Sequence, residues 1–252
     1  AATGVIQPGG SGSAAVNGAG GLDNLSAGTS RGVAVLDSGS KIAAGSGGVS
    51  ITASAVAGTV SPMWLGNSGV ISTTGTGAVS IASDGLLIDT GGTINAGANA
   101  VTLKPKTTGA QLDVGGSDLA GSLAVSDAEF DAITAGTINF GDTTTGPVNL
   151  TAAMTRTSAT AVTLNSGSTV NITTGTLDTA GGNVTLNPGT TVSPANSGVE
   201  ISSGAGTVGF GAGDDLRLVV AGLTVDTQYQ QLNVAGKVDL TGADLLLVGS
   251  LV

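Results

Sequence analysis

The chain lacks two of the residues on which most enzyme and metal chemistry depends. It contains no cysteine and no histidine among its 252 residues, and only 2% of them are aromatic. Without cysteine, neither disulfides nor thiolate metal sites can form, and the absence of histidine removes the commonest general base and metal ligand. We therefore expect no cofactor, and most hydrolase and zinc mechanisms are excluded.

Basic residues are also scarce. Seven Lys and Arg stand against 17 Asp and Glu, which gives a formal net charge of −10. A surplus of acidic side chains repels nucleic acid and anionic membrane surfaces. No apolar run approaches the roughly 20 residues of a membrane-spanning helix. We expect no nucleic-acid partner and no membrane insertion by this segment, and any export signal would lie outside it.

Glycine and small aliphatic residues make up much of what is present. The 44 glycines accompany a hydrophobic content of 40% and a charged content of only 10%. Disordered chains are usually poor in hydrophobic residues and rich in charge, so this chain is expected to fold. A core of Val, Leu, Ile and Ala without bulky aromatics suits a narrow interior and favours a solenoid.

A short apolar-x-apolar pattern recurs along the chain beside Gly, Asn, Ser or Thr. Each copy predicts a strand of about three to five residues whose alternate side chains point inward. Glycine and asparagine between the copies provide the positive-φ corners that short strands need. The copies are Val49-Ser-Ile51, Val79-Ser-Ile81, Val101-Thr-Leu103, Val148-Asn-Leu150, Val162-Thr-Leu164 and Val184-Thr-Leu186.

The spacing of these strands predicts an all-β, right-handed parallel β-helix with three short strands per turn of about 22–24 residues. When turns are stacked, a turn that gains residues must change the residue spacing on all of its faces by the same amount. A ladder of Asn165 and Asn187 is also expected. The spacing is 22 for Val79–Val101, Val101–Leu123, Val162–Val184, Val170–Val192, Leu177–Val199, Leu216–Val238 and Leu223–Leu245, and 24 for Val184–Val208, Val192–Leu216 and Val199–Leu223.

Three regions depart from this rhythm. Residues 1–30, rich in Gly, Ala and Ser, are predicted to form an irregular edge, followed by a continuous β-helix over 31–252. The interval from Val49 to Val79 is 30 residues, which predicts a loop insertion near 58–68. Ser126-Asp-Ala-Glu129 has the form of a capping box and predicts a short helical turn near 126–133.

Two segments resemble known bacterial surface proteins. Residues 117–142, above all Ser126-Asp-Ala-Glu129 and Ile133-Thr-Ala-Gly-Thr-Ile138, resemble a stretch that recurs in filamentous-haemagglutinin-like and autotransporter-like proteins. That family often has a basic residue where Ala132 stands. Residues 230–245 are similar to a turn near the distal end of many β-strand-repeat passenger regions. The two matches together cover under a quarter of the chain.

The resemblance implies an extracellular or cell-surface location and a role in adhesion, biofilm formation or contact-dependent competition. It implies no enzymatic activity. A host or neighbouring-cell receptor or glycan is the partner expected on that basis. The apolar run Leu245–Val252 favours end-to-end self-association, and indicates a fragment or mature segment of a longer chain. A self-assembling filament or sheath subunit is therefore the first alternative to a shaft.

A glycan-active β-helix enzyme is the second alternative, because such enzymes group carboxylates on one surface. The candidate residues are Asp214, Asp215, Arg217 and Asp226, but adjacent Asp214 and Asp215 would point to opposite faces of a strand. Few aromatic residues are available to stack on sugars. A solvated corner with a local ion pair is the preferred interpretation.

Three further patterns suggest binding sites. Residues 209–216 resemble a single copy of a calcium-binding nonapeptide, a site that needs successive copies. Outward Thr102, Thr163 and Thr185 could form an ice-binding rank, but Ser80, Ala124 and Gly209 interrupt it. Met63, Trp64 and Tyr229 could contact a receptor, although Trp64 is expected to fold back against the shaft. No catalytic, cofactor or metal residue is assigned, and the binding residues stay unknown.

Overall fold

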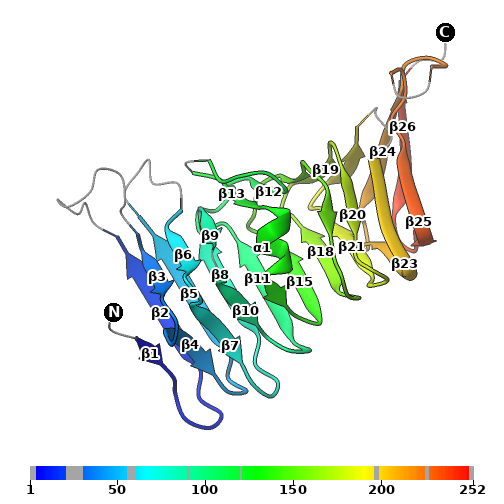
Figure 1. The fold of residues 1–252 in the computed structure, drawn as a ribbon. Coiled ribbons are helices and arrows are strands. Elements are labelled where there is room, and N and C mark those ends of the chain that lie inside the picture. Colours follow the sequence, from blue (N-terminus) through cyan, green and yellow to red (C-terminus); the bar gives the residue numbers. More distant parts are fainter. Residues whose placement is uncertain are drawn as a thin grey trace. The chain divides into compact units, whose positions relative to one another are not determined.

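The computed structural model is nearly all-β, with 52% of residues in strands and 2% in helix. It describes residues 4–20, 31–55, 61–89, 91–119, 121–195, 199–224 and 227–249. The chain forms two compact units, one of residues 1–110 and 117–138 and the other of residues 111–116 and 139–252. Within each unit, Figure 1 shows successive parallel strands running side by side. The prediction of one continuous β-helix over 31–252 stays a prediction.

In the first unit, successive strands enter three sheets in turn, and neighbours within each sheet are parallel. The first sheet contains β1 (Val5–Ile6), β4 (Lys41–Ala44), β7 (Val70–Thr73), β10 (Thr93–Asn95) and β14 (Ile133–Thr134). The second contains β2 (Ala14–Ala19), β5 (Val49–Ser54), β8 (Val79–Ser83) and β11 (Ala100–Lys104). The third contains β3 (Val33–Leu36), β6 (Met63–Gly66) and β9 (Leu86–Ile88). The unit also holds β13 (Leu123–Val125) and α1 (Asp127–Asp131).

The second unit contains two sets of parallel strands. One is β12 (Leu112–Val114), β16 (Val148–Leu150), β19 (Thr169–Ile172), β22 (Thr191–Pro194), β24 (Asp215–Val220) and β26 (Asp244–Gly249). The other is β17 (Met154–Thr155), β18 (Ala161–Asn165), β20 (Thr176–Asp178), β21 (Val184–Asn187), β23 (Val199–Phe210) and β25 (Leu232–Asp239). β15 (Thr137–Phe140) contains the boundary between the units.

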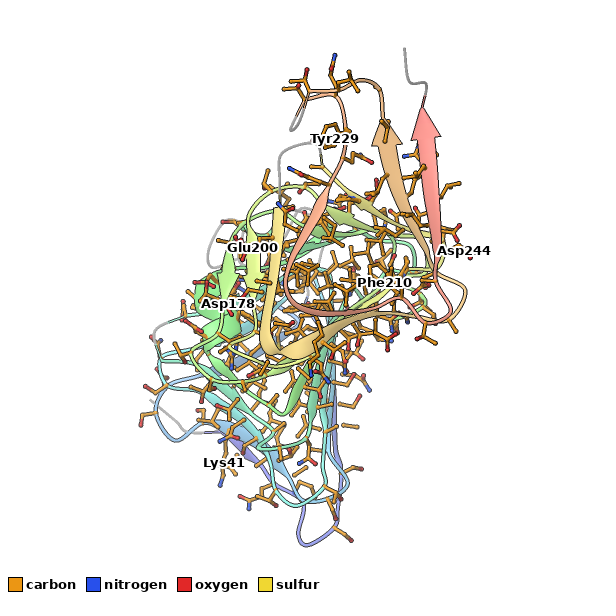
Figure 2. The ribbon with its side chains drawn as sticks, turned by 90° about the vertical axis from the view of Figure 1, so that its right-hand side faces the viewer. Lys41, Asp178, Glu200, Phe210, Tyr229 and Asp244 are labelled. Carbon is orange, nitrogen blue, oxygen red and sulfur yellow. The ribbon has the colours of Figure 1, made fainter. Side chains whose placement is uncertain are left out.

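The long strand β23 joins two faces that are separate in the preceding turn. Its first part pairs with β20 and its last part with β21. Figure 2 labels Glu200 near its start and Phe210 at its end. β25 pairs with both parts of β23, with a shift in register between Ser202 and Thr207. A corner of the earlier turn is thus replaced by an irregularity within one strand.

The predicted register is confirmed on two of the three faces of the second unit. Val162 pairs with Val184 and Val184 with Val208, and all three side chains are buried. The other face pairs residues 170 with 192 and 192 with 216, again with buried side chains. Because alternate residues of a strand point to the same side, each apolar side chain stacks on that of the neighbouring turn. In the first unit, the predicted pair Val79–Val101 is also confirmed.

The register predicted for the third face is wrong. Leu177 pairs with Ile201 rather than with Val199. The spacing on this face is therefore already 24 residues, because the two extra residues lie between Val192 and Ile201. Leu223 lies outside the strands with 83% of its surface exposed.

Three more predicted pairs are wrong. In the last turn, Val208 pairs with Val238 and Leu216 with Leu245, not Leu216 with Val238 or Leu223 with Leu245, because residues 221–231 lengthen the connection. In the first unit, Leu123 belongs to β13, which lies outside the sheet of β11 and Val101.

The predicted loop near 58–68 is a strand over much of its length. β6 pairs in parallel with β3 and β9, and its Met63 and Leu65 are fully buried. These alternate side chains stack on those of Val33 and Val35, so the segment contributes to the core. Residues 56–60 of the expected insertion lie outside the described part of the chain.

The predicted irregular edge over residues 1–30 also contains regular structure. β1 pairs with β4, and all six residues of β2 pair with β5. Alanine and glycine can occupy a strand whose partner fixes the register, although their intrinsic preference for strands is low. Residues 1–3 and 21–30 of this region lie outside the described part.

The predicted helical turn is confirmed as α1, residues 127–131. The Ser126 side chain accepts a hydrogen bond from the Glu129 backbone, and the Glu129 side chain accepts one from the Ser126 backbone. Phe130 is fully buried. Ile133, the last residue of the predicted turn, lies in β14 instead. No helix in the described ranges is long and apolar enough to cross a membrane.

Buried hydroxyl groups stabilise the corners between strands. Thr73 donates to the carbonyl of Gly77 at 2.6 Å, Ser83 to Gly85 at 2.6 Å and Thr179 to Gly182 at 2.6 Å. These bonds give each buried hydroxyl group a partner within its own corner. At the last corner the predicted positive φ is confirmed at Gly181, with φ 99°. A Cβ on Gly182 would lie 2.0 Å from the Thr160 carbonyl oxygen, so the turns approach too closely there for a side chain.

Candidate functional site

Outward-pointing amides form ladders on the second unit. Asn149 Nδ2 donates to Asp113 Oδ1 at 2.7 Å, and Asn171 Nδ2 donates to Asn149 Oδ1 at 2.8 Å. The predicted ladder of Asn165 and Asn187 is confirmed by a 3.0 Å bond from Asn187 Nδ2 to Asn165 Oδ1. Each of these Nδ2 groups donates to the paired residue of the preceding turn. These ladders stabilise the stacking of turns and give the face a fixed polar pattern.

The outward threonines do not form a continuous rank. Thr163 pairs with Thr185, but the next position after Thr185 is Gly209. In the first unit, Thr102 pairs with Ser80. An ice-binding surface needs a regular lattice of such side chains, and this register interrupts it at Ser80 and Gly209, as the sequence predicts.

The acidic residues near β24 differ in how far they are buried. Asp214 precedes the strand and is only 5% exposed, whereas Asp215 and Arg217 are half-buried residues within it. Burial raises the pKa of Asp214, a backbone hydrogen bond with Gly211 lowers it, and the charge of Asp215 raises it. Its Oδ2 atom has no hydrogen-bond partner among the described residues. Asp226 lies outside the described part of the chain.

Residues 209–216 are not arranged as a repeated calcium turn. Gly209 and Phe210 end β23, and Phe210 is buried. Within the described ranges, no group of three or more Asp, Glu, His or Cys side chains could hold a metal ion. The segment itself contains two acidic residues, Asp214 and Asp215, which is fewer than such a group needs.

The three candidate contact residues differ in accessibility. Met63 is fully buried in β6, so it is not an exposed contact residue. Trp64 is half-buried, as expected for a side chain that folds back: its Nε1–H donates to Asp89 Oδ2 at 3.1 Å, and the Arg31 guanidinium carbon lies 4.8 Å from its ring centre. Such a cation–π contact stabilises the indole against the protein. Tyr229 is half-buried and forms an antiparallel bridge with Val220.

Sequence reasoning missed a pair of carboxylates at the edge of β9. Asp118 Oδ2 accepts from the Leu86 backbone N–H at 2.6 Å, and Glu129 Oε1 accepts from the Ile88 N–H at 2.9 Å. The capping box predicted the helical role of Glu129 but not its bond to Ile88, 41 residues away. Nothing in the sequence pattern distinguished Asp118 from the other acidic residues.

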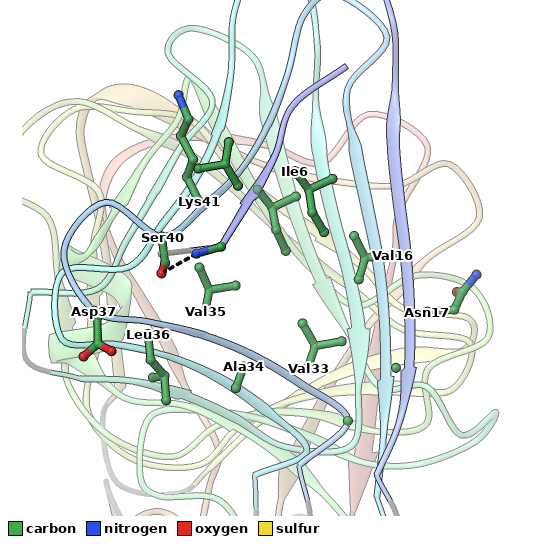
Figure 3. Close-up of a pocket in the computed structure, with 15 residues that line it drawn as sticks. Ile6, Val16, Asn17, Val33, Ala34, Val35, Leu36, Asp37, Ser40 and Lys41 are labelled. Carbon is green, nitrogen blue, oxygen red and sulfur yellow. Dashed lines mark hydrogen bonds between the residues drawn. The ribbon is translucent and has the colours of Figure 1, made fainter. Parts of the chain in front are cut away.

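Apolar side chains line a hollow beside edge strands of the first unit and are exposed on edge strands of the second. In the first unit, Val33, Val35 and Ile6 point into a hollow of about 680 Å³, while Ala34 and Leu36 point away from it (Figure 3). Ser40 Oγ accepts from the Gly4 N–H at 3.3 Å beside the hollow. In the second unit, exposed apolar residues lie within β25 and β26 or directly after β25: Val238, Leu240, Leu245, Leu246 and Leu247.

Comparison with known proteins yields no relative: no family model, curated protein or solved structure matches the chain. The likeness of residues 117–142 to filamentous-haemagglutinin-like proteins therefore stays a prediction.

Proposed function

We propose that the chain is a stretch of right-handed parallel β-helix, with three short strands per turn, that serves as a non-enzymatic shaft of a bacterial surface protein. In this role it attaches the cell to a receptor or glycan, or acts as a spacer that holds another binding region away from the cell. Its location is extracellular or on the cell surface.

The observation that carries the proposal is the order in which strands enter the sheets. In the first unit, β1 to β9 enter the three sheets in turn, three times over, and each strand from β1 to β8 pairs in parallel with its counterpart one round later. A chain that repeats this order advances by one strand spacing, about 4.8 Å, with every round. Such a structure extends in one direction without a deep cleft, which suits a shaft.

The outer surface supports a structural role. Asn149, Asn171 and Asn187 use their side chains on equivalent residues of neighbouring turns. Asp214 is buried and Asp215 half-buried, so the two carboxylates are not equally accessible from the surface. Groups that satisfy one another along the ladder stabilise the stack rather than remain available for a reaction.

A direct test compares attachment with catalysis. Beads coated with the folded chain should adhere to host-cell or bacterial-cell layers above the level of beads coated with the heat-unfolded chain. The same protein should release no reducing ends or unsaturated products from a broad glycan panel. Glycan degradation that the double variant D214N/D215N abolishes without unfolding would contradict the proposal and favour the enzyme.

A self-assembling filament subunit is the second candidate, and exposed apolar residues on β25 and β26 favour it. Val238 and Leu245 occupy positions that are buried one turn earlier, yet they are 50% and 56% exposed. A second copy could bury them by pairing its β2 edge with β25. This pairing would continue the parallel ladder from one chain to the next.

Electron microscopy and sedimentation at several concentrations distinguish the two candidates. A filament subunit should form fibres of constant width, and L245K should prevent them. L119K is the matched control, because Leu119 is 67% exposed but belongs to the first unit and to neither β25 nor β26. Monodisperse single chains at all concentrations would eliminate the filament.

A further inference from the structure

Four Asn-x-Ser/Thr triplets occur in the sequence, beginning at Asn24, Asn149, Asn171 and Asn183. Enzymes that attach sugars to asparagine recognise this triplet on the protein surface, where they can reach its amide nitrogen and its hydroxyl group. Asn24 lies outside the described part of the chain. The fold places the amides of the other three triplets in different surroundings.

The amides of Asn149 and Asn171 are both held in a ladder of the second unit. Asn149 Nδ2 donates to Asp113 Oδ1 at 2.7 Å, while Asn149 Oδ1 accepts from Asn171. Asn171 Nδ2 donates twice, to Asn149 Oδ1 at 2.8 Å and to Thr169 Oγ1 at 3.2 Å. Both side chains are half-buried. A sugar on either nitrogen would replace one N–H group and bring a bulky substituent against the neighbouring turn.

The hydroxyl groups of these two triplets are also engaged. Thr151 Oγ1 donates to the Gly115 carbonyl at 2.8 Å, and Thr173 Oγ1 donates to the Leu150 carbonyl at 2.6 Å. Each bond joins the triplet to the preceding turn. An enzyme would therefore have to wait for a local opening of the stacked turns to reach both groups of either triplet.

The triplet of Asn183 differs in both respects. Asn183 is exposed and lies directly before β21, and its Nδ2 has no hydrogen-bond partner among the described residues. Its Oδ1 accepts from the Thr207 N–H at 2.9 Å, which fixes the plane of the amide. The Thr185 hydroxyl likewise has no partner within the described ranges. A sugar on Nδ2 leaves Oδ1 in place, so the bond with Thr207 can persist.

Glycines leave open space beside this triplet. Apart from its chain neighbours, a Cβ added to Gly181 would meet no atom of the described residues closer than 4.0 Å. A Cβ added to Gly209, which is paired with Thr185, would meet none of them within 4 Å. The surface next to Asn183 and Thr185 can therefore admit a bulky group.

We propose that Asn183 is an acceptor for an N-linked sugar in the folded chain, and that Asn149 and Asn171 are not. In the transfer, Nδ2 attacks the anomeric carbon of a sugar nucleotide, and the new N–C bond replaces the bond from that carbon to the phosphate oxygen. The nucleoside diphosphate leaves with the electron pair of the broken bond, and one Nδ2 proton passes to a base of the transferring enzyme. The modification is independent of whether the chain serves in attachment.

A soluble asparagine-specific glycosyltransferase, supplied with a uridine diphosphate hexose, tests the proposal on the whole folded chain. Synthetic peptides of the three triplets establish first that the chosen enzyme accepts each sequence. Peptide mapping by mass spectrometry should then show transfer to Asn183 at least about 10-fold faster than to Asn149 or Asn171, since two hydrogen bonds at each of those sites must open first. Equal rates at the three sites, or no transfer to Asn183, would overturn the proposal.

Variants of the triplet hydroxyl provide the matched comparison. T185V removes the hydroxyl of the accessible triplet with little change in shape and should abolish transfer to Asn183, whereas T185S retains the hydroxyl and should preserve it. T173V makes the same change in the triplet of Asn171 and should leave transfer to Asn183 unaltered. Undiminished transfer in T185V would contradict recognition through this triplet.

The protein isolated from the cells that produce it provides a second measurement. Its peptide containing Asn183 should carry a sugar, while the peptides containing Asn149 and Asn171 should have unmodified masses. An Asn183 that is entirely unmodified in this material would refute the proposal.

Discussion

Val208 and Val238 occupy paired positions in neighbouring strands of the second unit, yet their environments are opposite. Val208 is fully buried, whereas Val238 is 50% exposed. The same contrast separates Leu216, 9% exposed, from its partner Leu245, 56% exposed. The residue type and the register are alike, so neither determines burial. The difference lies in the neighbouring strands: Val208 and Leu216 have a paired residue on both sides, whereas Val238 and Leu245 have one on a single side among the described residues.

The largest effect is expected from a charge placed inside a covered stack. V184D would bury a carboxylate among Val162 and Val208, and we expect a loss of about 4 kcal/mol in the free energy of unfolding. T185D, at the adjacent outward position, should cost about 0.5 kcal/mol. Urea denaturation measures both variants. Equal losses would show that the inward and outward assignments are wrong.

The comparison of Leu216 with Leu245 is tested by the same truncation at each site. L216A removes a buried side chain and should cost about 3 kcal/mol, while L245A should cost under about 1 kcal/mol. Thermal and chemical denaturation of the two variants provide the measurement. If L245A were the more damaging change at low protein concentration, a further layer would cover β26 in solution.

An amide ladder should contribute less than the apolar stack. N171A removes the hydrogen bonds from Nδ2 to Asn149 and to Thr169, and we expect a loss of about 1 kcal/mol. S193A changes the paired outward position one strand later and should cost under about 0.5 kcal/mol. Denaturation by urea again measures the difference, which should vanish if the ladder adds nothing to stability.

The smallest effect concerns the buried carboxyl at the start of β24. Because burial raises the pKa of Asp214 above 3.8, its ionisation destabilises the fold as the pH rises. D214N should therefore be the more stable protein at neutral pH, and its advantage should shrink as the pH falls toward 4. Denaturation of both proteins from pH 4 to pH 8 checks the sign. An advantage that grows in acid would contradict it.

The sequence predicts the fold best where a full turn repeats without change. Val162 and Val184 are 22 residues apart and keep an identical pattern around them, so their pairing follows from spacing alone. The prediction for Leu177 fails because Val199 and Ile201 are both apolar and two residues apart in the sequence, so the alternating pattern accepts either register. The pairing with Ile201 depends on the length of the preceding corner.

Other features depend on contacts that no local pattern records. Met63 and Leu65 alternate as strand residues do, but the 30-residue interval around them does not match the common period. Asp118 acquires its role from Leu86, 32 residues earlier, and from a strand edge whose exposure only the assembled sheet defines. Glu129 was identifiable as a helix cap because its partner, Ser126, is local.

The joining of two faces in β23 has a mechanical consequence. β20 and β21 are separate strands in one turn, but both pair in parallel with the same 12-residue strand of the next turn, β23. A pulling force that detaches one of them acts on β23 and is transmitted along its backbone to the other. The two earlier strands therefore cannot separate from the next turn independently. A tensile load at this point is shared by two rows of hydrogen bonds.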